Sequence, residues 1–101
     1  RSLELVPVRQ MSQIQFKLAE VMQAEGKTEE AIEEYMKVTY LYAEDNSLVV
    51  KSLLRVAELY EGKENYKEAV SIYKRVASLN VDESKYAQER IGQIMARKGG
   101  R

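Results

Sequence analysis

The chain has 101 residues, of which 45% are hydrophobic and 32% are charged, and its formal net charge is zero. This length suits one domain at most, and such a composition is typical of a folded globular chain rather than a disordered one. Cysteine and histidine are both absent. Their absence excludes disulfides, thiolate metal sites, and the commonest general base and transition-metal ligand. We therefore expect no enzymatic activity, no cofactor and no metal.

Charge is unevenly distributed along the chain. Residues 1–50 hold five Lys and Arg against nine Asp and Glu, whereas residues 51–101 hold eleven against seven, giving net charges of −4 and +4. Neither half is basic enough to indicate nucleic-acid binding. The opposed charges are consistent with steered association or simply with two solvated surfaces.

Neither a membrane-spanning segment nor a signal peptide is visible, because no apolar run approaches the required length. The chain begins with Arg1 rather than Met, so we expect it to be part of a longer protein. The cytoplasm and the bacterial periplasm both remain open as its location.

Apolar residues recur at helical spacing in five segments, at about 7–25, 28–43, 47–61, 65–79 and 83–98, and none alternates with the period of a strand. Pro7 suits the first turn of the first helix. In the first two helices we expect the core face to consist of Met11, Ile14, Leu18 and Met22, then Ala31, Tyr35, Val38 and Tyr42. In the other three we expect Val50, Leu53, Val56, Ala57 and Tyr60, then Ala69, Tyr73, Val76 and Leu79, then Ala87, Ile91 and Met95.

Two similar sequence motifs occur at an offset of 38 residues. "GKTEEAIEEY" at 26–35 returns as "ENYKEAVSIY" at 64–73, and "KLAEVM" at 17–22 returns as "RVAELY" at 55–60. A partial third copy, "RIGQIM", follows at 90–95. A fixed period of this length predicts a helical repeat array, in which each helix pair buries its apolar face against the next.

These motifs resemble the tetratricopeptide repeat over about residues 11–99. The first helix of each repeat carries a large, a small and a large residue: Leu18, Ala19 and Met22, then Val56, Ala57 and Tyr60, then Ile91, Gly92 and Met95. The "YLYAED" segment at 40–45 is similar to the repeat ending of bacterial cell-envelope proteins of this family. The resemblance implies an all-α, short right-handed solenoid of about 2.5 repeats and five antiparallel helices. Repeat 1 would cover about 11–46, repeat 2 about 47–82, and a closing helix about 83–98, within a single domain over 1–101.

The resemblance also implies a concave groove, lined by the first helix of each repeat, that binds a peptide or protein partner. Carried over by alignment, its residues are Phe16, Lys17, Glu20, Lys51, Leu54, Arg55, Glu58, Glu61, Arg90 and Gln93. Lys17, Arg55 and Arg90 would form a basic ladder, with Phe16 and Leu54 as apolar anchors. Alternatively, the ladder forms ion pairs between repeats, such as Arg90 with Glu58. Phe16 and Glu20 replace the residues with which chaperone-binding members clamp a carboxylate, so we expect no such clamp.

A cluster of acids on the second helix is interpreted as a solvated face, since no His is present to complete a metal site: Glu29, Glu30, Glu33 and Glu34. Our leading hypothesis is a non-enzymatic protein-interaction module of a larger scaffold. One alternative is head-to-tail self-assembly into a homo-oligomer through the exposed solenoid ends. The other is a regulatory repeat domain attached to an enzyme elsewhere in the full-length protein.

Overall fold

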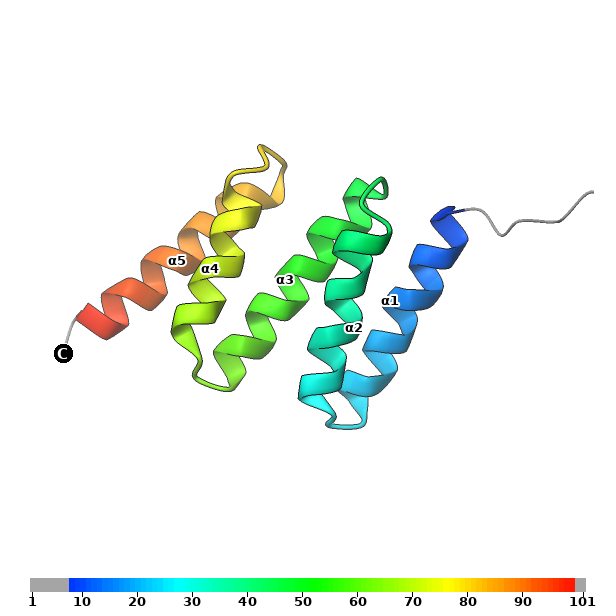
Figure 1. Ribbon diagram of the computed structural model, residues 1–101. Helices are drawn as coiled ribbons and strands as arrows, with labels where there is room; N and C mark the ends of the chain where they lie inside the picture. Colours follow the sequence, from blue (N-terminus) through cyan, green and yellow to red (C-terminus); the bar gives the residue numbers. More distant parts are fainter. Residues whose placement is uncertain (1–7, 100–101) are drawn as a thin grey trace, which may run out of the picture. The chain divides into compact units, whose positions relative to one another are not determined.

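The computed structural model describes residues 8–99, which form five α-helices and contain no strand. They are α1 (Val8–Ala24), α2 (Thr28–Leu41), α3 (Asn46–Gly62), α4 (Tyr66–Ala77) and α5 (Glu83–Gly99) (Figure 1). The predicted all-α fold of five helices is confirmed, and each described helix end lies within two residues of its expected position. Pro7, the expected start of the first helix, lies outside the described residues.

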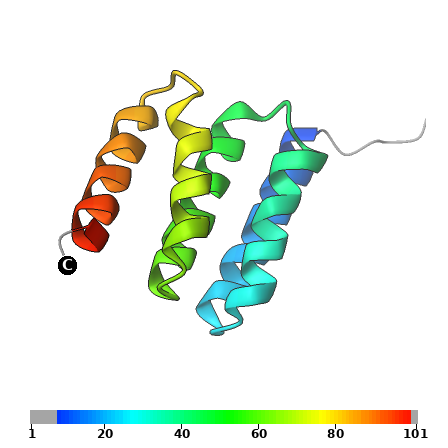
Figure 2. The same ribbon diagram turned by 60° about the vertical axis from the view of Figure 1, so that its left-hand side comes forward.

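The chain divides into two compact units, Arg1–Ser52 and Leu53–Arg101, and the division falls inside α3. In the first unit α1 packs against α2, and in the second α4 packs against α5. The first pair is coloured blue and cyan in Figure 1, and the second pair is yellow and orange to red in Figure 2. The division into repeats at 11–46, 47–82 and 83–98 stays a prediction.

The core of the first unit contains a different face of α1 from the one predicted. Ser12, Phe16 and Ala19 are buried, whereas Met11, Ile14 and Leu18 are 39%, 65% and 42% exposed, so the prediction for these three was wrong. The buried set lies about one residue, or 100°, around the helix from the predicted set. Small Ser12 and Ala19 on either side of Phe16 allow a second helix to approach α1 closely, which the larger side chains would prevent.

Polar and aromatic contacts fix α1 in this orientation. The Phe16 ring meets Tyr35 of α2 edge-on, with ring centroids 5.2 Å apart. The Tyr35 hydroxyl donates to Gln23 Oε1 at 2.6 Å, and Ser12 Oγ donates to Asp45 Oδ2 at 2.6 Å. These contacts give the buried polar groups partners on other elements, so they select one face of α1 for the core.

The predicted core faces of α2, α3 and α4 are confirmed with three exceptions. Tyr42 and Tyr60 are only half-buried, and Leu79 is 45% exposed, which corrects its predicted burial. On α5, Ala87 is buried and Ile91 half-buried, but Met95 is 52% exposed, which corrects its predicted burial. Ile94 takes the buried position one residue earlier. Ser84 at the start of α5 donates from Oγ to the Val76 carbonyl at 2.8 Å and so ties this helix to the end of α4.

The turns after α1 and α3 are repeats of one backbone motif. After α1, the Lys27 amide donates to the Met22 carbonyl and Gly26 has a φ of 81°. After α3, the Asn65 amide donates to the Tyr60 carbonyl and Glu64, 38 residues beyond Gly26, has a φ of 61°. Both helices therefore end with a left-handed residue, a conformation that glycine adopts without the steric penalty of a Cβ.

Replacing Phe16 and Ile14 separately by Ala tests the orientation of α1. We expect Phe16→Ala to lower the free energy of unfolding by about 3–5 kcal/mol, because it empties a packed site, and Ile14→Ala to change it by less than about 0.5 kcal/mol. Urea unfolding of both variants measures the difference. A larger loss for Ile14→Ala than for Phe16→Ala would contradict the observed core.

Replacing Glu64, whose backbone is in the left-handed conformation, by glycine should stabilise the protein. We expect Glu64→Gly to raise the free energy of unfolding by about 1 kcal/mol, because a side chain in this conformation is strained whereas glycine is not. Gly26→Ala is the matched control and should lower it by a similar amount. The same urea assay checks both changes, and a gain from Glu64→Ala would point to charge rather than backbone strain.

Candidate functional site

Of the four expected groove residues in the first unit, one is buried, one is half-buried and two are exposed: Phe16, Glu20, and Lys17 with Lys51. Phe16 is only 6% exposed, and Lys51 Nζ lies 5.4 Å from its ring centroid. Phe16 is therefore a core residue, and its predicted role as an exposed anchor was wrong. Lys17 has a 75% exposed side chain and forms an ion pair with Glu20 at 3.4 Å. A pair so close to solvent contributes little to stability, which leaves Lys17 suited to a role at the surface.

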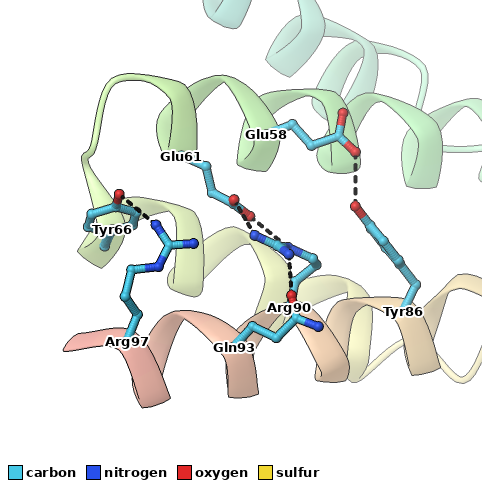
Figure 3. Close-up of polar contacts among 7 residues, drawn as sticks. All are labelled: Glu58, Glu61, Tyr66, Tyr86, Arg90, Gln93 and Arg97. Carbon is cyan, nitrogen blue, oxygen red and sulfur yellow. Dashed lines mark hydrogen bonds and ion pairs between the residues drawn. The ribbon is translucent and has the colours of Figure 1, made fainter. Parts of the chain in front are cut away.

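In the second unit, α3 and α5 are joined by a bidentate ion pair (Figure 3). Arg90 Nη2 lies 2.5 Å from Glu61 Oε1, and Arg90 Nε lies 3.0 Å from Glu61 Oε2. Arg90 also donates to the Gln93 amide oxygen one turn along α5. Two parallel bonds between a guanidinium and a carboxylate are both strong and directional. They link α5 to the C-terminal end of α3.

Aromatic hydroxyls lie on both sides of this ion pair. Tyr86 donates to Glu58 Oε2 at 3.4 Å, and Arg97 Nη1 lies 3.4 Å from the Tyr66 hydroxyl, with its guanidinium 5.9 Å from the Tyr66 ring centroid. Tyr73 is fully buried and contacts Tyr86 edge-on, with centroids 6.3 Å apart. The predicted groove includes neither Tyr66 nor Tyr73. The sequence predicts Tyr73 as a core residue, because Tyr35 occupies the equivalent position in the first repeat.

The ion pair sets the electrostatics of the second unit. Partial burial acts to raise the pKa of Glu61, but the hydrogen bonds and positive charge of Arg90, the nearby Tyr73 hydroxyl and the positive charge of Arg97 together hold that pKa below its ordinary value. Burial, with the nearby Glu61 carboxylate, raises the pKa of Tyr73. The buried Tyr73 hydroxyl has no hydrogen-bond partner among the described residues, and the charge of Glu61 favours its protonated form.

The predicted basic ladder is not uniform. Arg90 is held by Glu61 rather than by Glu58, which was the pairing considered from the sequence. Lys17 is exposed, and Arg55 is half-buried. On α3 itself, Lys51, Leu54, Arg55 and Glu58 share one face because they are spaced by three and four residues. Among the three ladder residues and Lys51, the exposed positive charges are therefore Lys17 and Lys51.

Among residues 8–99, no three or more acidic, His or Cys side chains come together as a possible metal site. None of the described helices has the length and apolar character to cross a membrane.

Comparison with known families finds one described as "SNAP: Soluble NSF attachment protein", whose model matches residues 7–89, more than four fifths of the chain. This is a family of helical repeats that form adaptor- and scaffold-type modules and are generally non-enzymatic. No curated protein and no solved structure matches the chain.

The Arg90–Glu61 pair should make stability depend on pH. The pKa of Glu61 is lower in the folded chain than in the unfolded one, so its stabilisation is present above the unfolded value and is lost as pH falls through the folded value. We expect Glu61→Gln to lower the free energy of unfolding at neutral pH by about 1–3 kcal/mol, and this difference to shrink below about pH 4.

Urea melts of wild type and variant at neutral and acidic pH measure this difference. Glu89→Gln is the matched control, because Glu89 is exposed on α5. An effect of Glu61→Gln that stayed constant across the pH range would show that packing, rather than the carboxylate charge, is responsible.

Proposed function

Because the chain belongs to the soluble NSF attachment protein family, we propose that it is a non-enzymatic module that binds a protein or peptide partner. The family match over residues 7–89 is the observation that carries this proposal. We further propose that its helix pairs are tetratricopeptide-like repeats. The name of the family describes attachment to NSF, which makes NSF the first partner to test.

The binding surface that we propose lies on the first helices of the repeats. In the first unit it includes Lys17 and Lys51, whose exposed charges favour a segment that carries acids. Half-buried Leu54 on the Lys51 face of α3 offers an apolar contact. Exposed charges at such a surface mainly set the rate of encounter, whereas apolar anchors set the lifetime of the complex.

Self-association is a second candidate, favoured by an apolar stripe along α1. Met11, Ile14, Leu18 and Val21 follow one another at spacings of three, four and three, and their exposed fractions range from 39% to 65%. This is the spacing of a seam between two packed helices. The opposite net charges of the two halves of the chain would support a head-to-tail contact.

Binding kinetics with purified NSF, and with any other protein retained by the immobilised chain, test the first candidate. We expect the double variant Lys17→Glu/Lys51→Glu to lower the association rate constant by about tenfold and to weaken its salt dependence, because the steering charge is reversed. We expect Leu54→Ala to increase mainly the dissociation rate constant.

Lys85→Glu is a control for charge reversal, since it alters an exposed lysine on α5. Thermal melts of all variants show whether each remains folded. Folded Lys17→Glu/Lys51→Glu and Leu54→Ala variants that bind every retained protein with wild-type rates would rule out this surface. Sedimentation velocity over a range of concentrations tests the second candidate, which requires concentration-dependent self-association that Ile14→Glu abolishes.

A further inference from the structure

A groove of about 600 Å³ lies along the second unit, where α4 packs against α5. Its lining combines an apolar floor with polar and cationic sides and consists of Tyr66, Lys67, Val70, Ser71, Lys74 and Met95. Met95 is 52% exposed although its helix neighbour Ile94 is 1% exposed. None of the described residues that line the groove is acidic. The groove is thus an apolar surface with positive charge beside it.

The repeat register identifies a second unusual position on α5. Ala19, Ala57 and Gly92 occupy equivalent places in the three copies. Ala19 and Ala57 are both 0% exposed, whereas Gly92 is exposed and a Cβ built on it would meet nothing within 4 Å. A glycine inside a helix is less favourable than alanine by about 1 kcal/mol. Within residues 8–99, no packing contact at Gly92 accounts for this small residue.

In the first unit the equivalent small residue belongs to a helix pair. Ala19 lies on α1, which packs against α2, and on α2 Ala31, Tyr35 and Val38 are all fully buried. Gly92 and Met95 share one face of α5, because they are three residues apart. By analogy with Ala19, this face has the form of one half of a helix pair whose other half is not among the described residues.

Charge indicates what kind of helix would complete the pair. The α2 sequence carries four Glu and one Lys, and α4 carries three Lys and Arg and one Glu, on the same pattern of Ala, Tyr and Val. Lys67 and Lys74 would lie beside a helix docked in the groove. An acidic helix of the α2 type would neutralise these charges, and a basic helix of the α4 type would be repelled.

We propose that the groove between α4 and α5, together with the Gly92 face, docks an amphipathic helix of a partner protein that has small and aromatic residues on one face and carboxylates beside them. This inference deepens the proposed function and rests on it. The side chain that is missing at Gly92 would allow the backbone of the docked helix to approach α5 as closely as α2 approaches α1.

A pair of synthetic peptides tests the site on the intact chain. The acidic probe is the α2 sequence, residues 28–41, and the control probe is the α4 sequence, residues 66–77, each blocked at both ends. We expect the acidic peptide to bind more tightly than the control by about tenfold or more, and by less at high salt. In amide NMR spectra, the acidic peptide should shift residues of the groove, such as Lys67, Lys74 and Met95.

Two glycine variants make the test specific. Gly92→Leu should weaken binding of the acidic peptide by about tenfold or more, because its side chain occupies the contact. It should leave the fold intact, since the site is open. Gly62→Leu is the matched control, because a Cβ there also meets nothing within 4 Å, and it should bind as wild type does.

Three results would overturn the proposal: equal binding of both peptides, wild-type binding by a folded Gly92→Leu, or amide shifts that lie at α1 rather than at α4 and α5. A natural partner lost by Lys17→Glu/Lys51→Glu but retained by Gly92→Leu would support the proposed function and reject the groove as its docking site.

Discussion

Close approach of paired helices is the constraint on which this structure depends. Two helices can pack at short distance only where the facing residues are small, and here Ala19, Ala31, Ala57 and Ala69 are all completely buried. Tyr35 and Tyr73, four residues after the alanines of α2 and α4, are equally buried and are the two largest fully buried side chains among the described residues. The repeated sequence motif therefore corresponds to a contact between helices that occurs in both copies.

The number, limits and class of the helices could be predicted from the sequence because local spacing and turn residues decide them. Which face of α1 is buried could not be predicted from the sequence, because that helix has two apolar faces. Met11, Ile14 and Leu18 have the stronger periodicity, yet the face with Phe16 and Ala19 is buried. In α3 both corresponding residues, Val56 and Ala57, are buried, so the same reasoning succeeded there. Periodicity identifies an apolar face but does not identify the neighbour that covers it.

The same limit applies to the candidate site. Helical spacing places Glu58 and Glu61 one turn apart on the same side of α3, so either could reach a cation on a neighbouring helix. Only the position of α5 determines that Arg90 meets Glu61 while Tyr86 meets Glu58. Phe16 illustrates a second kind of error. The family alignment places it in an exposed groove, although it contacts Tyr35 in the core. Alignment carries over a position on a helix, whereas burial depends on the side chains around it.

The buried residues of α2 recur in α4, whereas the exposed charged residues do not. The buried alanine, tyrosine and valine of α2 recur in α4, but the exposed residues around them change from mainly acidic to mainly basic. Exposed charge contributes little to stability, so it can diverge between repeats without loss of the fold. It contributes much more to the choice of partner, because like charges in contact disfavour association. A repeat of this kind thus keeps its fold through the repeated contact between helices, while the exposed charges on each helix differ from one copy to the next.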